Sequence, residues 1–147
     1  MKKTSITAIA LLLLGYSSAS AESWEFLSRE TLSVQASVYK NTDGITRLSD
    51  GTIYAPKLVV FDQMQRGVET FDRLGGSFID TRYPHRSVFH GSVYDCRRGT
   101  VAQIHTVYFS ENRPSEAAMV AYFVEDDPAP TALLVEYDVM YRYVCGQ

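Results

Sequence analysis

The sequence predicts an α+β fold: an antiparallel β-sheet of about five to six strands, with a C-terminal α-helix packed on one face and linked to the sheet by a disulfide. Three observations support this prediction. Most of the chain alternates apolar with small or polar residues, which is typical of half-buried strands. From Thr131 onward the apolar residues recur instead at helical spacing. The only two cysteines, Cys96 and Cys145, lie one on each kind of segment.

The first residues predict a bacterial export signal, residues 1–21. Lys2 and Lys3 precede a mostly apolar run, and Ala19-Ser20-Ala21 has the small-residue pattern of a cleavage site. The run is shorter than the roughly 20 apolar residues that a membrane-spanning helix needs. We therefore expect a mature protein that begins near Glu22, is not inserted in the membrane, and is periplasmic or secreted. No cysteine lies near the cleavage site, so no lipid anchor is expected.

The charge of the chain disfavours nucleic acid as a partner. Its 14 basic and 17 acidic residues give a net charge of −3, and removal of the leader takes away two lysines and lowers that charge to −5. Phosphate contacts require clustered Lys and Arg, which an acidic chain does not favour. The remaining residues, 22–147, fit one domain and contain no repeat or linker that would divide it.

Five strands are expected from the period of two. In chain order they are residues 32–39, 57–63, 86–96, 100–109 and 117–125. Turn sequences separate them, such as Asn41-Thr42-Asp43-Gly44 and Gly75-Gly76. Because glycine adopts the positive φ that tight hairpins require, these segments favour antiparallel connections.

The helix is expected to begin near Thr131. Its apolar stripe consists of Leu133, Tyr137, Met140, Tyr141 and Val144. Asp127 can cap free backbone N–H groups, and the prolines that follow it are tolerated in a first helical turn.

The cysteine pair predicts a structural disulfide between strand and helix. In an exported chain a single long-range pair is usually structural, whereas a redox-active pair would need neighbouring cysteines such as C-x-x-C. On the strand that ends at Cys96, the even-numbered residues share a face. That face, which carries His90 and Tyr94, should lie toward the helix.

The segment Tyr94-Asp95-Cys96-Arg97-Arg98, the strand that carries Tyr108, and the closing Val144-Cys145-Gly146 together resemble the bacterial surface-adhesin protein E-like domain. The resemblance covers most of residues 24–146. It implies a non-catalytic binding domain with an antiparallel sheet and a disulfide-linked helix, whose partner is a protein ligand or a host extracellular matrix component. Tyr94-x-Cys96-x-x-Gly99 is also similar to small periplasmic lysozyme inhibitors, which makes inhibition of a cell-wall hydrolase the alternative. For that function, Glu125-Asp126-Asp127 is the candidate acidic tip.

No residue pattern predicts an enzyme or a cofactor. Ser37-Val38-Tyr39-Lys40 matches S-x-x-K, but it lies on a strand and the chain lacks the Lys-Thr-Gly that such enzymes need. A metal-assisted hydrolase would have to use His90 and His105. A hairpin that turns at Arg98-Gly99 would place His90 opposite Val107 and His105 opposite Ser92, two positions out of register.

Two surfaces are candidates for binding. The locally basic stretch from residue 82 to 98 suggests an anionic-ligand patch formed by Arg82, Arg86, Arg97 and Arg98. The strand at 117–125 is apolar on both faces, while one helix can cover only one of them. We therefore expect a homodimer or partner interface that includes Tyr122, Val124 and Tyr143.

Overall fold

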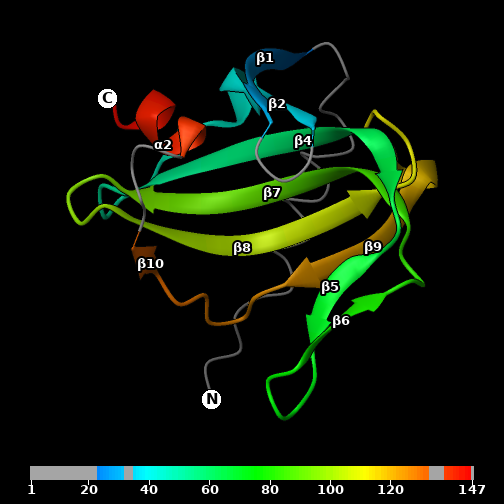
Figure 1. Ribbon diagram of the computed structural model, residues 1–147. Helices are drawn as coiled ribbons and strands as arrows, with labels where there is room; N and C mark the ends of the chain where they lie inside the picture. The colour runs from blue at the N-terminus through cyan, green and yellow to red at the C-terminus, as the bar shows by residue number, and fades with distance from the viewer. Residues whose placement is uncertain (1–22, 32–34, 133–137, 147) are drawn as a thin grey trace.

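The computed structural model describes residues 23–31, 35–132 and 138–146 (Figure 1). Its strands are β1 (Trp24–Glu30), β2 (Ala36–Asn41), β3 (Thr46–Arg47), β4 (Ile53–Gln65), β5 (Val68–Phe71), β6 (Ser77–Asp80), β7 (His85–Asp95), β8 (Thr100–Phe109), β9 (Met119–Val124) and β10 (Thr131–Ala132). One α-helix, α2 (Val139–Val144), lies near the C-terminus, and two 3₁₀ turns, η2 (Thr42–Gly44) and η3 (Glu116–Ala118), lie between strands.

Eight of the strands form one antiparallel sheet, so the expected sheet type is confirmed and the expected strand number was too low. The order is β1-β2-β4-β7-β8-β10, with β3 also pairing with β4 and β9 also pairing with β8. The missed strands are short or lack clean alternation. β4 and β7 are the two central strands of the sheet. They are long and rich in valine and aromatic residues, which favour strands.

The two faces of the sheet carry separate apolar clusters. Leu58, Phe89 and Val107 pair across β4, β7 and β8, so their buried side chains share one face. Ala55 and Tyr94 lie on the other face, where they pack with Met140 and Tyr141 of α2. The rings of Tyr94 and Tyr141 are 6.4 Å apart, centroid to centroid.

The C-terminal helix is shorter than expected. Thr131 and Ala132 form β10, which pairs with Val101 and Thr100, so a helix start at Thr131 was wrong. Residues 133–137 lie outside the described residues. The helix begins after Asp138, whose carboxylate accepts a hydrogen bond from the Tyr141 amide at 2.7 Å and so caps the first turn. No helix of the described chain has the length and hydrophobicity to cross a membrane.

The predicted disulfide between Cys96 and Cys145 is confirmed and joins residues 49 apart in sequence. Cys96 lies in the turn between β7 and β8, where the Asp95 carboxylate accepts hydrogen bonds from the amides of Arg97 and Arg98. The Tyr141 hydroxyl donates to the Cys96 carbonyl at 3.3 Å. The turn is therefore attached to α2 by a covalent bond and a hydrogen bond.

β5 and β6 form a separate two-stranded ladder that continues the β4–β7 hairpin. Val60 pairs with Ser87 in the β4–β7 ladder, and Val68 pairs with Asp80 in the β5–β6 ladder. The chain advances eight residues from Val60 to Val68 and seven from Asp80 to Ser87, so the two sides of the hairpin are nearly equal in length between the ladders. Figure 1 shows this hairpin extending away from the eight-stranded sheet. We call residues 66–82 the arm.

Candidate functional site: a hollow beside a gap in the sheet edge

The outer edge of β8 is covered by two different strands with a gap between them. β9 pairs with the part of β8 from His105 to Phe109, and β10 pairs with Thr100 and Val101. Neither strand pairs with the segment 102–104. Ile104 is the extra residue of a β-bulge there, because Gly91 pairs with His105 while Ser92 pairs with Gln103.

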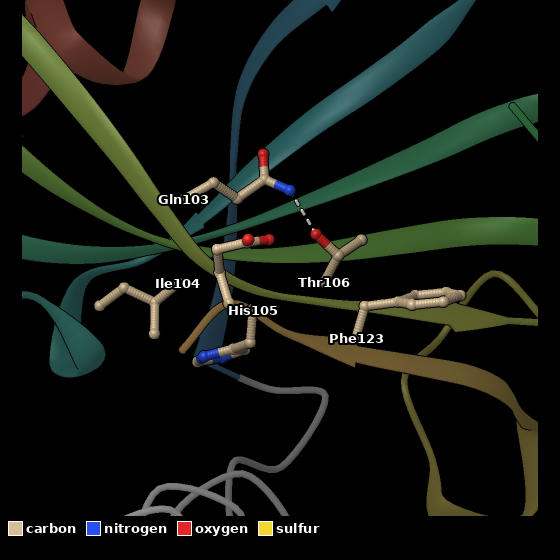
Figure 2. A pocket seen from close by; sticks show the side chains of 6 residues that line it. Gln103, Ile104, His105, Thr106 and Phe123 are labelled. Atoms are coloured by element: carbon tan, nitrogen blue, oxygen red, sulfur yellow. Dashed lines mark hydrogen bonds between the residues drawn. The ribbon is translucent and has the colours of Figure 1, made fainter. Parts of the chain in front are cut away.

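A small hollow of about 100 Å³ lies at this gap (Figure 2). It is lined by Gln103, Ile104, His105, Thr106, Phe123 and Glu125. One edge is held by the Glu125 amide, which donates to the Ile104 carbonyl at 2.8 Å. Its volume corresponds to roughly three water molecules, enough for the end of one side chain.

The hollow combines an aromatic ring, an amide and a carboxylate. The Phe123 side chain is 47% exposed, and its ring makes edge contacts with Tyr83 and Tyr108 at centroid distances of 6.1 and 5.9 Å. The Gln103 amide donates a hydrogen bond to the Thr106 hydroxyl, as Figure 2 shows. The Glu125 side chain is exposed. An aromatic face beside a carboxylate suits an ammonium, a guanidinium or an amide.

The polar lining continues away from the hollow to His90. Thr106 pairs with His90 across β7 and β8, with 3.4 Å between the hydroxyl oxygen and Nδ1. Lys57 on β4 lies on the other side of His90. Burial, together with the smaller effect of the neighbouring Lys57 charge, lowers the pKa of His90 to about 3. His90 is therefore neutral at physiological pH.

His105 occupies the opposite face of the sheet. Figure 2 shows its ring pointing away from the side chains of Gln103 and Thr106. The ring stacks on Phe89 with centroids 5.2 Å apart, and its Nε2 lies 3.5 Å from the Tyr54 hydroxyl. Burial lowers the pKa of His105 and raises that of Tyr54 to about 12.

The expected register of the histidines was off by one residue. His90 pairs with Thr106 and His105 with Gly91, which puts the two imidazoles on opposite faces of the sheet. They therefore do not converge on one metal ion. Within the described ranges no group of three or more His, Cys, Asp and Glu side chains is arranged to hold a metal.

The basic stretch divides into two pairs at opposite ends of β7. Arg86 donates to the backbone carbonyls of Phe61 and Asp62, and Arg82 forms an ion pair with Asp80 at the base of the arm. Arg97 and Arg98 lie in the turn at the other end, about 30 Å away at 3.3 Å per residue. The four guanidinium groups therefore do not form one patch.

The residues of the expected interface also lie apart. Tyr122 packs against the cluster around Phe89, and Val124 pairs with His105 on the same face. Tyr143 is on α2, where the Lys40 ammonium lies 4.6 Å from its ring centroid. The large apolar side chains of β9 that are exposed are instead those of Met119 and Phe123, and Phe123 pairs with Thr106 on the other face.

Sequence reasoning noted the acidic run that begins at Glu125 but missed Gln103, Thr106 and Phe123 as parts of a site. The gap that creates the hollow depends on a two-residue strand, β10, and on one bulge residue, Ile104. Neither feature has a distinct sequence signal. No family model, no curated protein and no solved structure matches this chain.

Proposed function

We propose that this chain is an exported binding domain for a protein ligand, and that the hollow at the β8 edge receives a basic side chain of that ligand. The observation that carries the proposal is the combination of the half-exposed Phe123 ring with the exposed Glu125 carboxylate around a space of side-chain size. A cation placed there meets both an aromatic face and an opposite charge.

The charge of the protein supports a basic ligand. The net charge is −5 without the leader, and Asp126 and Asp127 extend the exposed acidic run of Glu125. Complementary charge accelerates encounter and disfavours acidic competitors. The resemblance to surface-adhesin protein E supports a host-matrix ligand, and the leader and disulfide support a periplasmic or secreted location.

A direct test uses side-chain analogues as probes. In ¹⁵N-resolved NMR titrations of the mature protein, N-acetyl-lysinamide and N-acetyl-argininamide should shift the amides of residues 102–106 and 123–126. N-acetyl-norleucinamide, which keeps the four-carbon chain of lysine but lacks the ammonium, should not. Glu125→Gln should weaken the response at least about fivefold, because it removes the charge that the probe meets. Glu111→Gln, at another exposed glutamate, is the matched control.

The same variants should then be compared on purified host-matrix glycoproteins immobilised on a sensor surface. Loss of binding with Glu125→Gln and retention with Glu111→Gln supports the proposal. Equal shifts with the norleucine and lysine probes would contradict it, since the hollow would then be selecting apolar area rather than charge.

A second candidate function is inhibition of a cell-wall hydrolase. The exposed carboxylates of Asp126 and Asp127, on the connection between β9 and β10, favour it because they could enter the cleft of a basic enzyme. Hen egg-white lysozyme, assayed by clearing of bacterial cell walls, is the probe. This function is supported if the protein inhibits lysozyme and the double variant Asp126→Asn/Asp127→Asn does not. It is excluded for this enzyme if lysozyme keeps its full activity in an excess of the protein.

A further inference from the structure

The arm presents apolar side chains that the described chain does not cover. Leu74 at its tip is 96% exposed, and Phe78 and Ile79 on β6 are 50% and 53% exposed. Because successive residues of a strand point to opposite sides, Phe78 and Ile79 lie on opposite faces of the hairpin. An isolated two-stranded hairpin is marginally stable in water, whereas three or more strands are stable.

The arm is nevertheless built with a defined turn and base. The Asp72 carboxylate accepts hydrogen bonds from the amides of Leu74 and Gly76, at 2.8 and 2.9 Å. At the base, Arg82 donates from Nε to Oδ1 of Asp80 and from Nη2 to Oδ2. A Cβ on Gly67 would lie 2.7 Å from the Asp80 carbonyl carbon, so the two strands approach closely there. These features present β6 in one conformation.

The outer edge of β6 has free ladder positions. The Asp72 amide donates to the Gly76 carbonyl at 2.8 Å, which marks that pair as hydrogen-bonded. Hydrogen-bonded and non-hydrogen-bonded pairs alternate along an antiparallel ladder, so the backbone groups of Phe78 point to β5. Those of Ser77 and Ile79 point away from it.

Two of the devices that usually protect an exposed strand, charged residues and proline, are absent from most of this short edge. From Gly75 to Ile79 it carries no charge and no proline. The exposed outer edge of the large sheet differs, since β1 carries Glu25, Arg29 and Glu30 and contains a bulge.

We propose that the β6 edge of the arm pairs with β6 of a second copy of this chain, antiparallel about a two-fold axis at Phe78, to form a four-stranded sheet. Ser77 would then exchange both backbone hydrogen bonds with the partner's Ile79, and the same exchange recurs across the axis. Phe78 would lie directly opposite Phe78 of the partner subunit, where side chains approach most closely.

Charge and symmetry favour a second copy as the occupant. In this register Asp80 lies opposite the partner's Gly76, and Arg82 lies opposite the partner's Leu74, so no like charges meet. The surface is complementary to itself, as a two-fold contact requires. On β5 a two-fold axis at Glu69 would instead place two carboxylates opposite each other. The hollow is not involved, so this inference stands independently of the proposed function.

Cross-linking tests the register. In the mature protein, Phe78→Cys should form a disulfide-linked dimer within minutes of mild oxidation, because non-hydrogen-bonded pairs bring their Cβ atoms to about 5 Å. Phe26→Cys is the matched control, since Phe26 is 60% exposed on β1. It should cross-link at least about tenfold more slowly. Equal rates for the two variants would overturn the proposed register.

Sedimentation equilibrium tests the association itself. The mature protein should be a dimer at micromolar concentration. Ile79→Pro removes an outward N–H without removing a bond within the hairpin, and the loss of two backbone hydrogen bonds per dimer should raise the dissociation constant about 10- to 100-fold. Ile79→Val keeps the N–H and should keep the dimer. Thermal unfolding checks that both variants retain the large sheet. A monomeric wild type up to millimolar concentration, or a dimer unaffected by Ile79→Pro, overturns the proposal.

Discussion

Gly91 on β7 makes room for a side chain on the neighbouring strand. A Cβ at this position would lie 2.5 Å from Nε2 of His105 and 2.8 Å from the hydroxyl oxygen of Tyr54. The imidazole can therefore stack on Phe89 only because residue 91 has no side chain.

We expect Gly91→Ala to lower the free energy of unfolding by about 1–3 kcal/mol, the usual cost of overpacking a core. Urea unfolding measures it. In the double variant Gly91→Ala/His105→Ala the new methyl group occupies the space that the imidazole leaves. The double variant should therefore lose less unfolding free energy than the two single variants lose together. Strict additivity would mean that the imidazole is not the neighbour that resists the methyl group.

His90 makes stability depend on pH. Its pKa is about 3 in the folded protein, against 6.5 for an ordinary histidine, because burial and then Lys57 disfavour the imidazolium. The unfolded state therefore binds more protons than the folded state between pH 6.5 and about 3. Stability is fully present above pH 6.5 and declines as the pH falls through that window. The lowered pKa values of His85 and His105 act in the same direction.

We expect His90→Gln to reduce the slope of unfolding free energy against pH, between pH 6 and 4.5, by up to about 1.4 kcal/mol per pH unit, the value for one proton. Urea unfolding at closely spaced pH values measures this slope. Lys57→Met should reduce it less, because burial is the larger cause. An unchanged slope in His90→Gln would show that this imidazole titrates normally.

At the scale of elements, α2 depends on links to other parts of the chain. Six residues are too few for a stable helix in isolation. Its ends are held by the Asp138 cap, the disulfide and the Tyr141 hydroxyl. The helix is therefore maintained by tertiary contacts rather than by intrinsic propensity.

Removal of the disulfide should be costly. For a separation of 49 residues, the chain-entropy relation gives about 4 kcal/mol for the Cys96→Ala/Cys145→Ala variant. Tyr141→Phe, which removes only the hydrogen bond to the Cys96 carbonyl, should cost about 1 kcal/mol. Denaturant unfolding of both variants under oxidising conditions gives the comparison. A disulfide loss no larger than that of Tyr141→Phe would contradict this account.

The same elements show what a period-two pattern can and cannot predict. It located β7 and β8 and the greater part of β2, β4 and β9, which the predicted ranges overlap. It could not give the β7–β8 register, since the bulge at Ile104 changes the pairing by one residue and such a shift exchanges the faces. The pattern also missed β5 and β6, because strands of four residues are too short to show a clear alternation. The prediction that Thr131 is helical failed because pairing with β8 determines its conformation.

At the scale of the whole molecule, the hollow and the arm are separate surfaces. The hollow lies at the β9–β10 gap on one edge of the large sheet, and the arm continues the two central strands beyond it (Figure 1). A dimer formed through the arms would leave both hollows available. Each dimer would then present two copies of the binding site to a ligand, which raises avidity without any new contact.

The predicted export signal, residues 1–21, can be tested on the intact chain. Expressed with its leader in a Gram-negative host, the protein should be recovered from the periplasm or medium with Glu22 as its first residue. Its mass should also be lower by the two hydrogens lost on disulfide formation. Intact-mass spectrometry before and after reduction measures both. Recovery of the uncleaved chain from the cytoplasm would refute the predicted location.

The continuity between the arm and the sheet also bears on how the chain folds. β4 and β7, the central pair, are connected through the arm, so they are neighbours in sequence as well as in space. Pairing can start at the turn around residues 72–76 and proceed toward Ile53 and Tyr94, with one irregular stretch between Gln65 and Val60. Each rung then closes only a short additional loop, which keeps the entropy cost of each step small. The exposed arm is thus the place from which the central strands β4 and β7 can assemble.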